Sequence, residues 1–576
     1  MKGLKRVFSL ILTVILITSM LVSCKGKTVE KVEKVVDETQ TVETIEVTPT
    51  VAAVKEGPSW TWDTEPIEID WFIDQNWFNI IWDEKNTLIH KKITEMTGIK
   101  INFIVPSGDA QQRLNTMIAA DDYPDIVTIT ASLPQVNRLV ESNKVLPLME
   151  LIEEYAPTFK EVLPESMVNW YTQPDGKWYG IPNYFDAPEY AYEGQELTSH
   201  AGFVAREDIM QELGINPEEF NTQEGTLNAL RKVRDAGLEN AGQPVIPLLI
   251  PSLGGLEGDM FLYESLLPGF FGIPIEDKEG NLLDIKKDPK YLEELKFLNT
   301  CYREGLLSIE NFTMQKQQIE EKMVNGNAFS FLGPLGDAKP LVQNLYNADN
   351  SRILKPYGPI RANDNATPTL MASGGNGWTV TMITKNAENP ERIIRLFELM
   401  YSEEGSLLGH WGIEGETYQV LENGQFEYTP EYKALREENS EKATAEYGLE
   451  SLYWVHNWQQ VVSKMQRGTE GAALLDDNLW HYYPEWSYDG RAFSNIEPDA
   501  ESDAAIIKIQ INGYILEQLP KIILAETEEG CIANYNEMIT QLDALGQKDV
   551  LAVMNEKFNA NKDKLNIEFM WPGYNQ

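Results

Sequence analysis

Cysteine, histidine and basic residues are scarce in this sequence of 576 residues, and each shortage excludes a class of function. The three cysteines and five histidines form no CxxC pair and no HExxH motif, so we expect no metal site and no cofactor. Lys and Arg together number 48 against 89 Asp and Glu, and the formal net charge is −41. A surface this acidic repels phosphate backbones, and we therefore expect no nucleic-acid partner.

Familiar catalytic motifs are missing as well. The sequence contains neither GxSxG nor a Walker motif, and the run Gly374-Gly375-Asn376-Gly377 lacks the strand–turn–helix context of a phosphate-binding loop. We therefore expect a protein that is not an enzyme. One enzymatic alternative stays open, because 89 acidic residues leave room for the carboxylate pair of a glycoside hydrolase.

Long apolar runs are missing everywhere except at the beginning of the chain. Residues 7–22 are almost purely apolar and follow Lys2, Lys5 and Arg6. A short apolar segment behind positive charges is typical of a signal peptide, and it is short for a membrane span.

The end of this run, Leu21-Val22-Ser23-Cys24, resembles the lipobox of bacterial lipoproteins. The resemblance implies that residues 1–23 are a signal peptide and that Cys24 carries the lipid that anchors the protein to the outer face of the cell membrane. Residues 24–59 contain no aromatic side chain, and we expect a disordered linker behind the lipidated cysteine. An ordinary cleaved signal or an uncleaved anchor is the alternative.

A change of pattern after residue 59 predicts a folded α/β body. Alternating apolar residues predict strands in 67–73, 99–105 and 125–130, and helical stripes lie between them. This order is typical of a mostly parallel sheet. Further strands are predicted in 245–250, 328–332 and 378–382, with helices from 289 to 302 and from 390 to 401, and the sequence after about residue 430 is mainly helical.

The order of several segments resembles that of bacterial extracellular solute-binding lipoproteins of carbohydrate ABC importers, in particular the large LplA-like members. The similar segments cover nearly the whole body and are ITEMTGIKINF (93–103), LNTMIAADDYPDIVTIT (114–130), DGKWYGIPN (175–183), REDIMQELGINP (206–217), YLEELKFLNTCYREGLL (291–307), GNAFSFLGP (326–334), ITKNAENPERIIRLFELMYSEEG (383–405) and WGIEGETYQV (411–420). Many relatives carry a calcium-like loop where this chain has 234–248, but regularly spaced acids are missing there.

The resemblance implies an α/β, two-lobed periplasmic-binding-protein-like fold, with a mostly parallel sheet flanked by helices in each lobe and crossing hinge strands. We expect lobe 1 in residues 60–185 plus 333–403 and lobe 2 in 186–332 plus 404–576. The resemblance also implies a monomer that closes on a ligand and then docks on the transmembrane permease subunits of an importer. Cys301 and Cys531 either pair or remain two buried thiols.

Sugar recognition requires aromatic side chains for the C–H faces and polar side chains for the hydroxyls. The candidate binding residues are Asp74, Asn76, Trp77, Tyr184, Phe185, Trp411, Glu414, Trp454, Trp458 and Trp486. For several of them packing is the alternative role: Trp454 and Trp458 share the i, i+4 spacing of a helical core face, and Trp411 fits a buried turn.

We therefore expect a binding protein that captures an oligosaccharide and delivers it to an ABC importer. Two alternatives stay open: a secreted lipoprotein glycoside hydrolase, and a peptide-binding member of the same fold.

Overall fold

The computed structural model describes residues 56–108, 110–199, 201–251, 258–372, 375–499 and 502–572. The predicted signal peptide, Cys24 and most of the predicted linker lie outside these residues. Residues Lys55–Gln576 form one compact unit, whose two larger sheets have separate hydrophobic cores. A bilayer-crossing segment needs a long apolar helix, and none of the described helices meets that requirement.

The first sheet confirms the predicted alternation of strands and helices. Its strand order is β2-β1-β3-β12-β4, with bounds β1 (Ile67–Ile73), β2 (Ile99–Ile104), β3 (Ile126–Thr130), β4 (Gly180–Pro182) and β12 (Thr379–Ile383). The strands β2, β1 and β3 are parallel, whereas β12 runs antiparallel to both of its neighbours, β3 and β4.

Both faces of the first sheet are buried, because successive side chains of each strand point to opposite sides. Trp71 and Ile73 of β1 pack in the first core, together with helix α13 (Pro390–Tyr401). Phe72 packs on the other face with Leu114 and Met117 of α2 (Ala110–Ala120). The sheet is thus a rigid support for the loops at its edges.

The turn after the first helix depends on a single glycine. Helix α1 (Leu88–Thr97) ends at Gly98, which has a left-handed φ of 70°. A Cβ atom at this position would lie 2.2 Å from the carbonyl oxygen of Thr64, so only glycine fits. The chain then enters β2 directly.

The second sheet has the order β10-β5-β9-β8, with bounds β5 (Ala201–Arg206), β8 (Ile246–Leu249), β9 (Ala328–Pro334) and β10 (Leu354–Tyr357). It differs from the mostly parallel sheet that we expected, since only β8 and β9 pair in parallel. β5 runs antiparallel to both of its neighbours, β9 and β10. The reason is that β5 arrives from the first sheet as an extended segment and not through a crossover helix.

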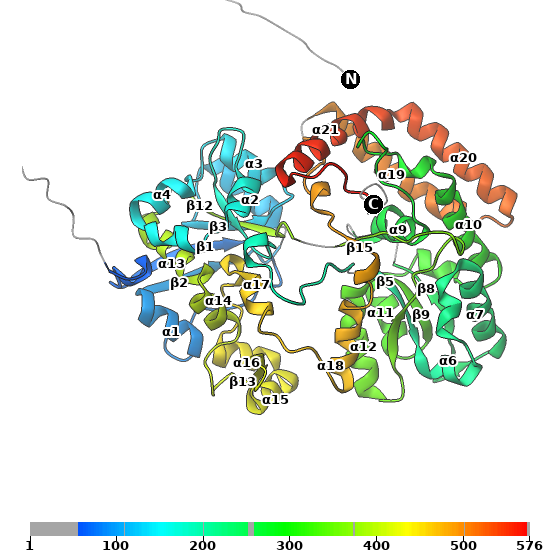
Figure 1. Cartoon of the computed structure of the whole chain (residues 1–576), viewed down its shortest axis with the longest axis horizontal. Helices are drawn as coiled ribbons and strands as arrows, with labels where there is room; N and C mark the ends of the chain where they lie inside the picture. Colours follow the sequence, from blue (N-terminus) through cyan, green and yellow to red (C-terminus); the bar gives the residue numbers. More distant parts are fainter. Residues whose placement is uncertain are drawn as a thin grey trace, which may run out of the picture. The chain divides into compact units, whose positions relative to one another are not determined.

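Helices surround the second sheet. They include α7 (Gln223–Ala236), α10 (Pro289–Arg303), α12 (Leu335–Ala348), α19 (Asp503–Ile523), α20 (Glu528–Leu545) and α21 (Gln547–Leu565). Helix α10 begins as predicted, with Pro289 at its first position and the Asp288 side chain accepting a hydrogen bond from the Lys290 amide. Helices α19 and α20 lie side by side and cover α10 (Figure 1).

The two cores divide the chain differently from the predicted lobe boundaries. Residues Leu341, Leu354 and Leu370 pack in the second core and not with lobe 1, because β10 joins the second sheet through β5. Residues 404–455 pack largely in the first core, because α14 (Glu403–His410) follows α13 directly and stays on the same side. Along the described residues, the chain passes between the cores within 183–200, 358–378 and 456–474.

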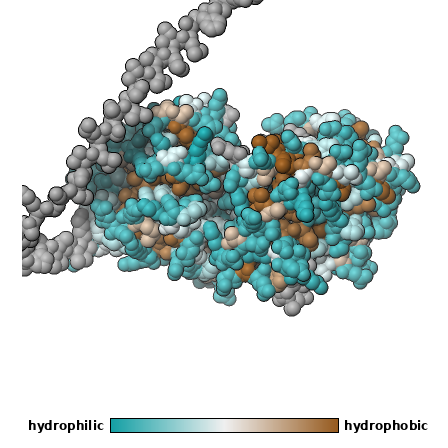
Figure 2. Space-filling view, turned by 90° about the horizontal axis from the view of Figure 1, so that it is seen from above, coloured by the Kyte–Doolittle hydropathy of each residue, from teal (hydrophilic) through white to brown (hydrophobic). Residues whose placement is uncertain are grey.

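The two remaining cysteines are both free thiols. Cys301 and Cys531 are fully buried in the second core and do not pair. Burial raises the pKa of the Cys531 thiol to about 11, which keeps it protonated and unreactive. Hydrophilic side chains cover most of the face seen in Figure 2, as the net charge predicts, with apolar side chains gathered in places.

Candidate ligand-binding site

Aromatic side chains gather at the carboxyl end of β1, where open α/β sheets bind their ligands. Strand β1 ends at Ile73, and the loop that follows carries Trp77, which is 54% exposed. We define the aromatic cluster as six tryptophan and tyrosine residues whose rings lie in contact from this loop onward: Trp77, Tyr184, Trp378, Tyr453, Trp454 and Trp458.

Two partly exposed indoles and one buried indole form the first part of this cluster. The rings of Trp77 and Trp378 are nearly parallel, with centroids 6.1 Å apart and an interplanar angle of 14°. The ring centroid of Trp454 lies 5.9 Å from that of Trp77 and 6.0 Å from that of Trp378, and Trp454 is fully buried. Trp454 therefore supports two indoles that reach solvent.

Two tyrosines and a further tryptophan continue the cluster. The ring centroid of Tyr453 lies 6.4 Å from that of Trp77, and the ring centroid of Tyr184 lies 6.0 Å from that of Tyr453. Tyr184 meets Trp458 edge to face at 4.8 Å. Its φ of 51° places a non-glycine residue in the left-handed region, a strained conformation that surrounding structure must hold in place.

Asp74 holds the loop that presents Trp77. Its Oδ2 accepts hydrogen bonds from the Thr130 amide at 2.7 Å and from the Thr130 hydroxyl at 3.0 Å. Its Oδ1 accepts one from Gln75 Nε2 at 2.6 Å, and Gln75 Oε1 in turn accepts one from Trp77 Nε1 at 3.2 Å. Burial raises the pKa of Asp74, although these hydrogen bonds oppose the shift.

Segments far apart in the sequence meet beside this cluster. The Asp186 amide donates to the Gly375 carbonyl at 2.9 Å, and Phe185 bridges to both Gly375 and Asn376. The Asn376 side chain donates to the Arg491 carbonyl at 3.0 Å. The chain passes between the two cores in two of these segments, so their junction is a natural hinge candidate.

The sequence-predicted candidates divide into those that join the cluster and those that do not. Trp77, Tyr184, Trp454 and Trp458 belong to the cluster. Asn76 is exposed in the loop beside Trp77, and Phe185 is buried 6.3 Å from Tyr171 at the junction.

Other candidates lie elsewhere. Trp411 is buried in the turn, where its Nε1 donates to the Val461 carbonyl at 3.2 Å, and Glu414 is exposed in the same turn. Trp486 packs against the second core, 6.1 Å from Tyr483. Packing therefore accounts for Trp411 and Trp486 without a ligand.

Sequence reasoning missed two members of the cluster, Trp378 and Tyr453. Trp378 precedes β12 and was read only as part of an alternating strand, and Tyr453 is the neighbour of the candidate Trp454. The helical i, i+4 face predicted for Trp454 and Trp458 is wrong. Trp454 lies in a 3-10 turn, η8 (Tyr453–Val455), and α17 (Trp458–Val462) begins only at Trp458.

Polar groups without partners lie behind the cluster. The Tyr453 hydroxyl and both ring nitrogens of His456 are buried and accept or donate no hydrogen bond within the described residues. Burial lowers the pKa of His456 well below its usual range, and His410, whose ring lies 6.2 Å away, acts in the same direction. His456 is thus a neutral imidazole.

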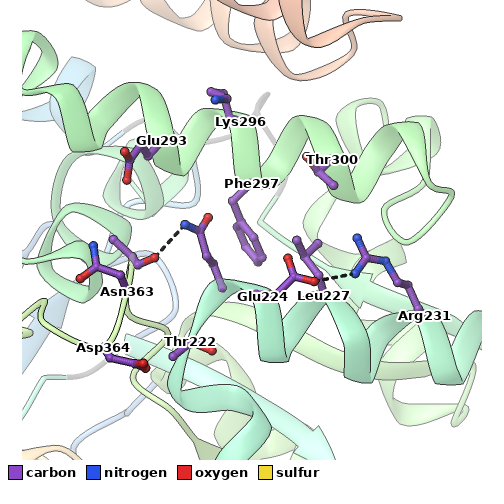
Figure 3. Close-up of a pocket in the computed structure, with 12 residues that line it drawn as sticks. Thr222, Glu224, Leu227, Arg231, Glu293, Lys296, Phe297, Thr300, Asn363 and Asp364 are labelled. Carbon is purple, nitrogen blue, oxygen red and sulfur yellow. Dashed lines mark hydrogen bonds and ion pairs between the residues drawn. The ribbon is translucent and has the colours of Figure 1, made fainter.

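A separate pocket of about 640 Å³ lies between α7, α10 and the segment 362–364. Figure 3 shows Glu293 and Lys296 on one of these helices and Glu224 and Arg231 on the other. Phe297 is only 2% exposed. No sequence-predicted site residue lines this pocket, and its walls offer polar groups but no open aromatic face. Within the described residues, no three His, Cys, Asp or Glu side chains gather as metal ligands would.

Comparison with known proteins agrees with this geometry. Residues 89–192, which include α1, β2, β3 and β4, match the family model of bacterial extracellular solute-binding proteins. Over these residues the chain is similar to extracellular solute-binding proteins, which agrees with the resemblance seen in the sequence.

Two curated relatives have sugar-binding names. The polygalacturonan/rhamnogalacturonan-binding protein YtcQ of Bacillus subtilis is 24% identical over 345 residues, which cover 58% of this chain and 64% of that protein. The fructooligosaccharide ABC transporter substrate-binding protein FusA of Streptococcus pneumoniae is 22% identical over 354 residues, covering 58% and 62%. The matches thus span somewhat less than two thirds of these relatives.

Solved structures confirm the two-domain α/β fold of solute-binding proteins. A solute-binding protein from Bifidobacterium longum infantis, described as HMO-binding and ABC-transporter-associated, matches with a TM-score of 0.64 at 15% identity, covering 86% of this chain and 99% of that one. An alginate-binding protein matches with a TM-score of 0.59 at 17% identity, covering 86% and 98%.

Proposed function

We propose that this protein is a lipid-anchored extracellular solute-binding protein that captures an oligosaccharide between two lobes and delivers it to the permease of an ABC importer. The observation that carries the proposal is the pair of partly exposed indoles, Trp77 and Trp378, held at the carboxyl end of the first sheet. The candidate site also includes Asp74, Asn76, Tyr184, Phe185 and Trp458, and Trp454 supports it from below.

Exposed indole faces suit sugars better than most other solutes. A pyranose or furanose ring presents C–H groups that stack on an aromatic face, and its hydroxyls need polar partners at the rim. The loop of Trp77 supplies both, since Gln75 and Asn76 flank the indole. The sugar-binding names of YtcQ and FusA support the same ligand class.

Binding, and not turnover, is the expected activity. The relatives are named as binding proteins, and the groups in contact with the cluster are mostly aromatic. A hydrolase needs two carboxyl groups on either side of the glycosidic bond. Asp74 is a poor member of such a pair, because its oxygens already accept hydrogen bonds from Thr130 and Gln75.

A glycan panel tests this function directly. Residues 55–576 form one compact unit, so they can be purified without the amino-terminal segment and titrated with plant and host oligosaccharides. We expect one glycan class to raise the melting temperature and change tryptophan fluorescence, while chromatography recovers the glycan intact. A shift by peptides alone would refute the sugar ligand, and release of shorter fragments would establish a hydrolase.

The lipid anchor is tested separately in cells. Cys24→Ala is expected to abolish labelling by radioactive palmitate and to release the protein from the membrane fraction. A chain that stays lipid-labelled after this substitution would refute the anchor at Cys24.

A further inference from the structure

The charged side chain that hydrogen bonds connect to the aromatic cluster is an acid, Asp74. Asp74 is connected to Trp77 through Gln75, by hydrogen bonds of 2.6 and 3.2 Å. Its carboxylate is 8% exposed and has no cation as a hydrogen-bonding partner, only the amides and hydroxyl of Thr130 and Gln75. An anion placed on the Trp77 face would therefore be repelled by a carboxyl group that lies behind Gln75 and has no cation among its hydrogen-bond partners.

Nearby carboxylates also raise the pKa values of the two tyrosines of the cluster. Burial raises the pKa of Tyr184, and Glu450 adds to the shift. Burial also raises the pKa of Tyr453, and Tyr184, Glu450 and Asp74 add to that shift in decreasing order. The Tyr453 hydroxyl has no hydrogen-bond acceptor within the described residues. The hydroxyl is buried and stays neutral, so it supplies no positive charge that could attract an anionic ligand.

The cation nearest to the junction is already engaged. Arg491 donates from Nε to Asp489 Oδ2 at 2.8 Å and from Nη2 to the same oxygen at 2.6 Å. Its Nη1 is 3.4 Å from the Asp186 carbonyl. Asp489 thus neutralises this guanidinium and occupies its Nε–Nη2 fork, so a uronate or sulfate would not find a free cation there.

These observations point to a choice of substrate within the proposed function. We infer that the aromatic cluster takes an uncharged glycan and rejects glycans that carry a carboxylate or sulfate on the ring that lies against Trp77 and Asp74. The inference rests on the proposed function. Rejection follows from the repulsion of like charges in a partly desolvated site, which is a recognised route to specificity. The names of the relatives leave the choice open, because one concerns an acidic polymer and the other a neutral one.

Matched pairs of glycans test the inference. The probes are oligogalacturonides with their fully methyl-esterified forms, and oligomannuronides with their carboxyl-reduced forms, titrated calorimetrically at neutral pH and low salt. We expect the neutral member of at least one pair to bind at least tenfold more tightly than its acidic partner. An acidic member that binds equally or more tightly would overturn this inference but leave glycan capture standing. If no glycan in either pair binds, the inference fails for these ligands, and the broader glycan panel decides the proposed function separately.

Charge-removing variants identify the source of the rejection. Asp74→Asn and Glu450→Gln are each expected to reduce the preference for the neutral member several-fold, with Asp74→Asn having the larger effect. Glu422→Gln, an exposed acid in the turn after Val420, is the matched control and should leave the preference unchanged. If Asp74→Asn fails to fold by circular dichroism, Glu450→Gln decides the result. An unchanged preference in every folded variant would overturn the assignment.

Discussion

At the scale of single residues, Trp77 and Trp378 stand out because their indoles reach solvent although a core lies beneath them. Trp454 fills the position below both rings and is completely buried. Apolar rings left in water forgo the free energy of burial, about 25 cal/mol for each Å² of apolar surface. A ligand that covers these faces recovers that energy, which is why we assign them to binding.

Truncation of Trp378 measures this contribution. Trp378→Ala is expected to weaken binding of the glycan identified by the panel by about 1–3 kcal/mol, because a stacking face is lost. Isothermal titration calorimetry provides the readout. Trp62→Ala, which removes a partly exposed indole from outside the cluster, is the matched control. Unchanged affinity in Trp378→Ala would remove this residue from the site.

Glu294 in α10 is exceptional for a different reason, because it is a buried carboxyl group that has no hydrogen-bond partner within the described residues. Both of its oxygens lack a hydrogen bond within the described residues, and burial raises its pKa well above the usual value of 4.5, with Asp288 adding to the shift and Lys286 opposing it. The folded protein therefore holds a proton that the unfolded chain releases above pH 4.5. The stabilising contribution is complete below that pH and is lost as the pH rises toward the folded pKa.

The substitution Glu294→Gln tests the direction in which stability changes with pH. The amide keeps the shape of the neutral acid but has no ionisation cost, so we expect stabilisation by about 1 kcal/mol or more at neutral pH. The difference in melting temperature between the variant and the wild type should shrink toward zero on acidification below the usual carboxyl pKa. A difference that does not change with pH would show that Glu294 is not the titrating group.

At the scale of elements, each of the two larger sheets contains one reversed strand. β12 runs antiparallel between β3 and β4, and β5 runs antiparallel between β9 and β10. Both strands follow segments in which the chain passes between the cores. Trp378 stands directly before β12, so the same strand links the two cores and positions the stacking face.

Gly377 directly precedes Trp378 and β12, and a side chain at this position should displace both. Its φ is 87°, and a Cβ atom there would lie 2.5 Å from the Cβ atom of Pro182 and 2.6 Å from the Asn183 carbonyl oxygen. Gly377→Ala should destabilise the fold by about 1–3 kcal/mol and weaken glycan binding by displacing Trp378. Urea unfolding and calorimetry measure the two effects.

The control for Gly377→Ala uses another glycine with a similar backbone. Gly415 has a φ of 81°, but nothing lies within 4 Å of the position of its Cβ atom. Gly415→Ala therefore carries the strain of the left-handed conformation without the clash, and it should leave binding intact. Equal losses of affinity in the two variants would contradict a specific role for the link.

Alternation could predict the strands in which apolar side chains recur at every second position, as they do in β1 and β2. β1, β2, β3 and β12 were predicted in this way. The direction of β5 was not, because alternation reports burial and not the orientation of a neighbour. The contact between Trp77 and Trp378 was also hidden, because it depends on β12 pairing with a strand distant in the sequence.

At the scale of the whole molecule, the proposed capture requires the two cores to move about the segments that join them. Hinge closure is driven by contacts that the ligand makes on both sides. We expect a saturating glycan to reduce the radius of gyration in solution, measured by small-angle X-ray scattering. Trp378→Ala at the same glycan concentration should show a smaller change. A radius that is unaffected by a tightly bound glycan would refute closure.

The burial of Cys301 and Cys531 has a practical outcome for such measurements. With the amino-terminal segment removed, neither sulfur is open to a maleimide dye, since both lie inside the second core as protonated thiols. A cysteine introduced on the surface near Trp77 would then be the single site of labelling. The protein could in this way be converted into an optical reporter of its own ligand without altering its interior.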